Sequence, residues 1–152
     1  MKTLTNGLLC LFFSCSFITA VSQPPVNEPD YNKPKLFQDL PEKLNVRLHD
    51  FEALLEAPLG QSVNIPLHGM ASLNGHIVSK SDVTDTRVKS VVVKLTNRKG
   101  ANFTFTRIAN EKGSPEYLGR IISREYGDSL EIVLEDGQYV FRKVGLYDLL
   151  AE

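Results

Sequence analysis

Residues 129–144, SLEIVLEDGQYVFRKV, have the pattern of a β-hairpin. Two stretches of alternating apolar and polar residues flank Asp136-Gly137, a dipeptide typical of two-residue turns because both central positions need positive φ. This turn sets Leu134 opposite Tyr139 and places the other inward residues of the two stretches opposite each other. Turn and hydrophobic pattern give the same register, and a one-residue slip would move every apolar side chain to the opposite face. This segment therefore predicts antiparallel β-structure.

A second feature is a phrase that occurs twice, SLNGHIVSK at 72–80 and EYLGRIISR at 116–124. Each has a large apolar residue, then Gly two positions later and Ile two after that. The second copy leads into the hairpin above, so we expect a three-strand unit over 116–145 and a similar one over about 72–109. Self-similarity that tolerates length changes in the loops indicates an internal repeat.

The repeated glycine occupies the same position in both expected units. In the second unit, Gly119 is expected beside Ile132, which itself faces Phe141. In the first unit, Gly75 is expected beside Val93, with Phe105 opposite that valine. A Gly within a strand weakens it unless a bulge, a bend or a large neighbour needs the space. We favour packing as the reason, and the alternative is a backbone site that a ligand approaches closely.

The remaining elements are short. Leu44, Val46 and Leu48 alternate as in a strand, and Asp50 is expected to cap a two-turn helix that buries one apolar face and ends before Pro58. The stretch SVNIPL at 62–67 is expected to form an edge or bulged strand because Pro66 cannot donate a backbone hydrogen bond. The leucines that follow Gly145 again have helical spacing and predict a second short helix. The fold class is all-β with two short helices: about seven antiparallel strands in a small barrel or sandwich, whose closure would remove exposed edges.

The N-terminus has the features of a secretory signal. A lysine is followed by an uncharged apolar run, and the small residues Ala20 and Ser22 precede a cleavage site before Gln23. We therefore expect a signal peptide at 1–22, a Pro-rich linker at 23–35 and one β-rich domain at 36–152. The protein is expected to be exported to the periplasm or the exterior, with lipid attachment at Cys15 as the weaker alternative.

The cysteine positions restrict the chemistry of the exported chain. Both cysteines of the sequence, Cys10 and Cys15, lie in the segment that is removed. No thiol then remains for a disulfide, a thiolate metal site or a cysteine nucleophile. About 130 residues remain, which is enough for one apolar core and too few for two ordinary domains.

Charge is uneven along the chain although the formal net charge is only -1. Residues 68–112 contain eight Lys or Arg and three Asp or Glu, whereas residues 113–152 contain four and eight. One basic flank can meet an acidic partner, although solvated strand faces give the same pattern. The outward basic side chains form the candidate partner surface: His76, Lys80, Lys94, Arg120 and Arg124.

Motifs for catalysis or metal binding are missing from the sequence. His49, His68 and His76 lack the spacing of a zinc site, and Asp82 and Asp85 lack the pattern of a calcium loop. There is no nucleophile elbow, phosphate loop or dinucleotide fingerprint. We expect no catalytic residue, metal or cofactor, and no nucleic-acid partner because the chain is not basic overall and its aromatics do not alternate with basic residues.

The chain resembles small uncharacterised secreted β-rich proteins of gliding-type Gram-negative bacteria. The stretches that carry the resemblance are VSQ at the cleavage site, LFQDLPEKL, GQSVNIPL, LNGHIVS, YLGRIIS and YVFRKV. Similar β-segments precede secreted proteases in such bacteria, whereas we expect this chain to act without a protease domain of its own. The shared motifs are apolar and structural, so the resemblance implies a fold and an exported location and assigns no functional residue.

Three functions remain open after these exclusions. The leading hypothesis is a non-catalytic secreted or periplasmic module that binds an unidentified protein partner, in an oligomeric state that the sequence leaves open. The second is a protease inhibitor whose loop enters an active site, stiffened by its proline. Its candidate inhibitory residues are Lys112, Gly113, Ser114, Pro115 and Glu116. The third is a carrier of a small apolar ligand, and an enzyme comes last.

Overall fold

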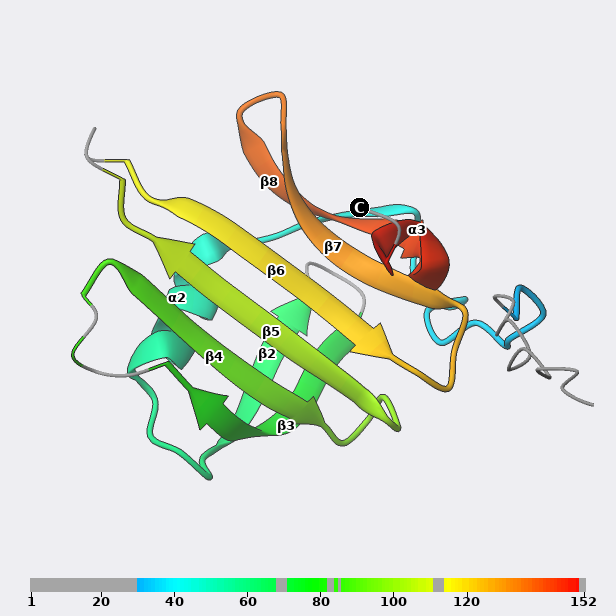
Figure 1. Ribbon diagram of the computed structural model, residues 1–152, viewed down its shortest axis with the longest axis horizontal. Helices are drawn as coiled ribbons and strands as arrows, with labels where there is room; N and C mark the ends of the chain where they lie inside the picture. Colours follow the sequence, from blue (N-terminus) through cyan, green and yellow to red (C-terminus); the bar gives the residue numbers. More distant parts are fainter. Residues whose placement is uncertain (1–29, 68–70, 82–83, 85, 111–113, 151–152) are drawn as a thin grey trace, which may run out of the picture.

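The computed structural model describes residues 30–67, 71–81, 84, 86–110 and 114–150. Within these ranges one eight-stranded antiparallel sheet curls into a half-barrel, with strand order β1-β8-β7-β6-β5-β4-β3-β2 (Figure 1). The strands are β1 Lys43–Asn45, β2 Ser62–Leu67, β3 Ala71–Lys80, β4 Val88–Leu95, β5 Ala101–Ile108, β6 Glu116–Ser123, β7 Asp128–Glu135 and β8 Gln138–Gly145. The helices are α2 Leu48–Glu56 and α3 Leu146–Leu150.

The hairpin predicted from 129–144 is confirmed as β7 and β8. Asp136 and Gly137 have φ of 50° and 78°, and Leu134 pairs with Tyr139 as the turn requires. Ile132 pairs with Phe141, and both side chains are buried. The side chain of Leu134 is 60% exposed because the tip of the hairpin extends past the rest of the sheet (Figure 1).

The register is confirmed in the second expected unit and differs in the first. Gly119 pairs with Ile132 as predicted. Gly75, however, pairs with Leu95 and not with Val93, and Val93 pairs with Phe103 and not with Phe105. The shift between β4 and β5 follows from a turn closed by Gly100 at φ 74°, where the N–H of Ala101 already donates to the carbonyl of Arg98 at 3.0 Å. Between β3 and β4, a bulge between Ile77 and Ser79 changes the register by one residue.

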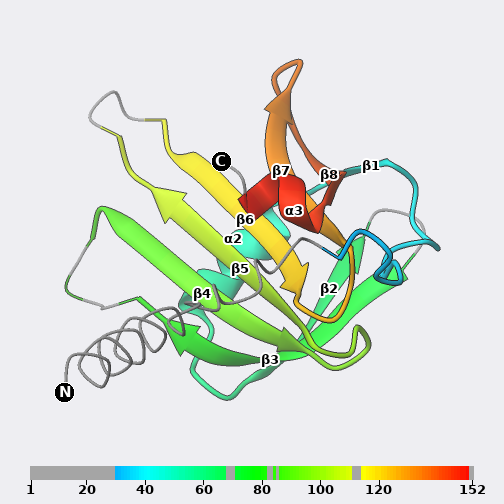
Figure 2. The ribbon, with the colours of Figure 1, turned by 45° about the vertical axis from the view of Figure 1, so that its right-hand side comes forward.

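Helix α2 fills the concave side of the half-barrel, behind β4, β5 and β6 in Figure 1 and inside the curl in Figure 2. Its Phe51 ring packs against Phe103, Phe105 and Phe141, with centroid separations of 5.5, 5.5 and 5.7 Å. The predicted buried face of this helix is confirmed. Its start is not, because the helix begins at Leu48 with Arg47 as N-cap. Consequently β1 ends at Asn45, and Leu48 is helical where we expected a strand.

The small barrel or sandwich of about seven strands is confirmed in its coarser form, as a curled half-barrel of eight antiparallel strands whose two edges remain unpaired with each other in the described residues. Strands β1 and β2 are its two edges, and the edge position expected from Pro66 is confirmed.

The segment that precedes β1 packs against the sheet at the point where β7 begins. There, the Asp128 carboxylate accepts hydrogen bonds from the backbone N–H groups of Leu36 and Phe37 at 2.5 and 2.9 Å. The described part of the expected linker also contacts this region, where the Lys33 ammonium donates to the carbonyl of Arg124 at 2.8 Å.

Candidate binding groove

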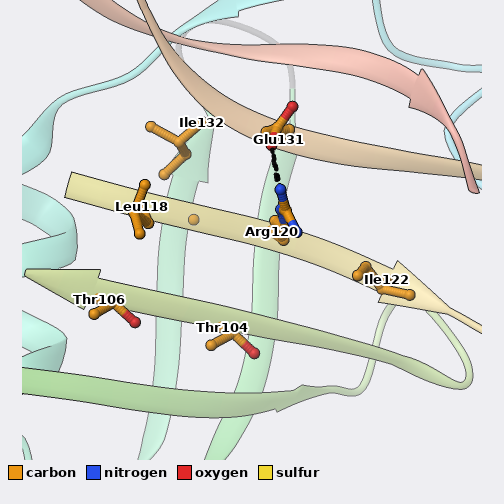
Figure 3. A pocket seen from close by; sticks show the side chains of 8 residues that line it. Thr104, Thr106, Leu118, Arg120, Ile122, Glu131 and Ile132 are labelled. Atoms are coloured by element: carbon orange, nitrogen blue, oxygen red, sulfur yellow. Dashed lines mark hydrogen bonds and ion pairs between the residues drawn. The ribbon is translucent and has the colours of Figure 1, made fainter. Parts of the chain in front are cut away.

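A furrow runs along the convex face of the sheet between β5 and β6. It consists of two adjoining hollows of about 390 and 260 Å³. The hollows share Thr104 and Ile122, so together they form one track beside β6. The larger is lined by Thr104, Thr106, Leu118, Gly119, Arg120, Ile122, Glu131 and Ile132 (Figure 3), and the smaller by Gly100, Asn102, Thr104, Ile122, Arg124 and Glu125.

Side-chain size along two neighbouring strands creates the furrow. Strand alternation turns Thr104 and Thr106 of β5 to the convex face, and their short side chains leave a low floor. On β6 the same alternation presents the longer Leu118, Arg120 and Ile122 (Figure 3). Leu118 is 48% exposed, so the wall has an apolar side chain in contact with water.

The charges in the larger hollow neutralise one another. The Arg120 guanidinium donates to Glu131 Oε1 from Nη2 at 3.0 Å and from Nε at 3.2 Å. Glu131 Oε2 lies 3.6 Å from Arg142 Nη2, so this carboxylate is held between two guanidinium groups. Arg142 also lies 3.8 Å from Glu135, which bonds Lys43 at 2.6 Å. The hollow therefore has no large excess of either charge. What it offers a partner is mainly apolar and hydrogen-bonding contacts.

The structure separates the predicted partner surface into parts. His76 and Lys94 face each other on the convex side of β3 and β4, and His76 Nδ1 also bonds Ser62 Oγ at 3.0 Å. Arg120 and Arg124 line the furrow on β6 and just beyond it. Lys80 points elsewhere, because its ammonium donates to the carbonyl of Ala57 after α2 at 2.8 Å.

Only part of the candidate inhibitory loop falls within the described residues. Lys112 and Gly113 lie outside them, as do His68, Asp82 and Asp85. Ser114 is exposed, Pro115 is half-buried, and Glu116 already belongs to β6, where it pairs with Ile108. Among the described residues there is no group of three or more His, Cys, Asp or Glu side chains placed to hold a metal ion.

A second polar cluster lies on the concave side, where β6 passes α2. The Tyr117 hydroxyl donates a hydrogen bond to the Glu52 carboxylate. The Tyr117 ring is 8% exposed, stacks on Phe105 and meets Tyr139 edge to face. Burial, followed by the hydrogen bond and the charge of Glu52, raises the pKa of Tyr117 above its ordinary value of 10.0. This cluster joins the helix to the sheet.

Sequence reasoning missed most of the furrow. It named Arg120 and Arg124, whereas the threonines of β5 and the apolar residues of β6 went unnoticed. The signal that would have found them is two short polar residues, Thr104 and Thr106, at outward positions beside a strand whose outward positions include Leu118 and Ile122. Pairing between strands has to be known before that signal can be used.

Within the part of the chain that the structure describes, helices are all too short or too polar to cross a bilayer. No protein-family model, curated protein or solved structure compared with the chain matches it.

Proposed function

We propose that this chain is a secreted, non-catalytic module that binds a protein partner along the convex furrow. The observation that supports this most directly is the furrow itself. The stretch from Leu118 on β6 to Arg124 just beyond it spans about 20 Å at roughly 3.3 Å per residue, enough for a partner segment of six or seven extended residues. Its lining combines an exposed leucine, threonine hydroxyls and neutralised ion pairs, the mixture of apolar and polar groups found in protein interfaces.

The two three-strand meanders, which we interpret as copies of one unit, differ on this face. The positions of Leu118, Arg120 and Ile122 in β6 correspond to Asn74, His76 and Val78 in β3. Strand β6 has the threonine-bearing β5 as neighbour, whereas β3 lies beside the edge strand β2. The furrow at β6 is therefore consistent with a binding function that only the second copy of the unit carries.

Export of the chain is part of the proposal. It rests on the N-terminal pattern of residues 1–22, which lies outside the described residues, and on the location of both cysteines in that segment. A partner is then to be sought outside the cytoplasm.

Two substitutions by arginine, one at a leucine in the furrow and one at a valine outside it, provide a matched test. Leu118 in the furrow and Val78 at the bulge of β3 are 48% and 47% exposed, so we expect replacement of either by Arg to have a similar effect on folding, which the melting temperatures of both variants check. The full chain with a C-terminal tag is used to capture partners from the periplasmic and extracellular fractions of its host, and a captured protein is then purified and titrated. We expect Leu118→Arg to weaken binding at least tenfold and Val78→Arg to leave it within twofold. Equal affinity for both variants would overturn the furrow as the binding surface.

Charge reversal tests the basic residues separately. Arg120→Glu places a carboxylate beside Glu131 within the furrow, whereas Lys94→Glu changes the convex face two strands away. Loss of binding in Arg120→Glu alone supports the furrow. Loss in both extends the partner surface to the basic set predicted from the sequence, and unchanged binding in both removes those charges from the interface.

A further inference from the structure

Strands β6 and β7 pair over only a short stretch before they diverge. The register joins Gly119 to Ile132, Arg120 to Glu131 and Ile121 to Leu130, and no pairing continues from Leu118 toward Val133. Both strands go on past this point, since β6 begins at Glu116 and β7 ends at Glu135. The β7–β8 hairpin thus turns away from β6 past Gly119 and Ile132 (Figure 1), and we call the stretch in which Tyr117 and Leu134 remain unpaired the notch.

Backbone hydrogen-bonding groups point into this notch from both strands. In an antiparallel sheet, alternate residues direct their N–H and C=O to opposite neighbours. Lys143 N donates to Glu42 O, so residues 139, 141 and 143 of β8 face β1 and Val140 and Arg142 face β7. The alternation then directs Val133 toward β8 and Leu134 toward β6. By the same count Tyr117 faces β7. Tyr117 and Leu134 therefore present N–H and C=O groups to the notch, without a strand partner across it.

Two exposed leucines flank the notch, and the Tyr117 and Tyr139 rings meet edge to face on its concave side. Leu134 and Leu118 are 60% and 48% exposed, one on each face of the sheet. The larger hollow of the furrow reaches Gly119 and Ile132, the residues at the base of the notch, although their side-chain positions belong to the concave face. Furrow and notch are therefore continuous. The nearby Glu131 is neutralised by Arg120, which leaves no excess charge at the base.

The outer edges of the sheet are less suited to pairing with another strand. Strand β1 has three residues, and β2 contains Pro66, which has no N–H to donate. Residues 62, 64 and 66 are the ones that face the open side of β2, because the N–H of Ile77 already donates to the carbonyl of Gln61 and the alternation continues from there. The notch has no proline at the two residues that face it.

We infer that the notch is a site of strand addition. An extended, uncharged segment of the partner, with apolar side chains at alternate positions, enters it and pairs antiparallel to β7 through the backbone of Leu134. Its other edge lies along β6 at Tyr117, and its continuation lies in the furrow. This inference rests on the proposed function, because it describes how the same partner is held. Main-chain bonds give affinity in this mode, and pockets for alternate side chains give specificity.

A linear dodecapeptide phage library, selected on the immobilised full chain, supplies the probe. Three substitutions separate the contributions: Leu134→Pro removes the N–H that faces the notch and leaves the β8-facing groups intact, Leu134→Ala keeps that N–H, and Leu118→Arg blocks the furrow. We expect the selected peptides to be uncharged and alternating. Leu134→Pro should weaken their binding at least tenfold and Leu134→Ala threefold or less, and N-methylation of one alternate set of peptide amides should abolish it.

Amide hydrogen exchange on the unaltered chain gives a measurement that does not depend on how the proline variant folds. In the free protein the amides of Tyr117 and Leu134 should exchange at least tenfold faster than those of Leu118 and Val133, which bond neighbouring strands. Peptide binding should protect Leu134 in particular. If peptides bind the wild type, bind Leu118→Arg more weakly and do not protect the Leu134 amide, then strand addition is wrong and the furrow is the binding surface. If the peptide affinity is unchanged in Leu118→Arg but falls in Leu134→Pro, then the notch is the binding site and the furrow is not part of it. Failure to select any peptide overturns strand addition by linear segments.

Discussion

Asp128 shows how one side chain fastens a distant part of the chain. It is 6% exposed, and its two carboxylate oxygens accept the N–H groups of Leu36 and Phe37. Asp128→Asn replaces one acceptor by an NH₂ donor and leaves a buried N–H without a partner, which costs about 1–3 kcal/mol. We expect urea unfolding to show this loss at neutral pH.

A surface carboxylate provides the comparison for Asp128. Asp39 forms a bidentate pair with Arg98, at 2.8 and 2.6 Å, but its side chain is 57% exposed. Water and salt screen such a pair, so Asp39→Asn should cost at most about 1 kcal/mol. Losses of equal size in Asp39→Asn and Asp128→Asn would show that the buried bonds to the N-terminal segment stabilise the fold no more than an exposed ion pair does.

Tyr117 predicts a pH dependence on the alkaline side. Its pKa is raised by burial and by Glu52, so the folded protein holds the phenolic proton more tightly than the unfolded chain does. The resulting stabilisation is complete below the ordinary pKa of 10.0 and is lost as pH rises through the higher folded pKa. Melting temperatures from pH 8 to 11.5 should show the advantage of the wild type over Tyr117→Phe shrinking above about pH 10. Tyr31→Phe, at a ring that is 76% exposed, controls for the loss of a hydroxyl; parallel curves for wild type and Tyr117→Phe would contradict the prediction.

At the scale of the strand, two glycines allow close contacts of different kinds. A Cβ at Gly119 would lie 2.8 Å from Ile132 Cγ1 and closer still to Cδ1, which are side-chain atoms. A Cβ at Gly75 would lie 2.5 Å from the carbonyl oxygen of Lys94, which is backbone. We expect Gly119→Ala to cost about 1–3 kcal/mol from overpacking. Because Ile132→Ala removes the clashing atoms, the double variant should be more stable than the sum of the single losses by about 1–2 kcal/mol.

A matched double-mutant cycle uses the corresponding glycine of the first three-strand unit. Gly75→Ala combined with Val93→Ala should show little such recovery, since the main clash is with a carbonyl that no side-chain truncation removes. Denaturant midpoints of the six variants decide this. Equal recovery in both cycles would mean that the backbone of β4 shifts as easily as the side chain of Ile132.

The same strands show how far the sequence predicts the fold. The β7–β8 register followed from a two-residue turn that permits one pairing, and the edge position of β2 followed from Pro66. The β4–β5 register did not follow, because Gly100 closes that turn earlier than the strand pattern implied. The furrow and the notch depend on which strands are neighbours and where two of them separate. Those properties arise from the packing of the whole sheet around α2 and are not visible in any one segment.

At the scale of the molecule, an open sheet needs something to hold its two halves together, and helix α2 does so through Phe51. This ring contacts Phe103 and Phe105 of the first meander and Phe141 of the second. Each half alone is a three-strand meander with one apolar face, which is at the lower limit of independent stability. We therefore expect the domain to unfold in a single cooperative transition.

Calorimetry of the full chain and two variants tests this expectation. Phe51→Ala should lower stability by about 3–5 kcal/mol, the usual loss for a buried aromatic ring. Leu59→Ala, at a side chain that is 66% exposed after the same helix, should change it by less than about 0.5 kcal/mol. Equal calorimetric and van't Hoff enthalpies in the wild type would establish one cooperative unit. Two separate transitions would mean that β3–β5 and β6–β8 are stable without α2 between them, and the boundary between these independent halves would then run along the pairing of β5 with β6.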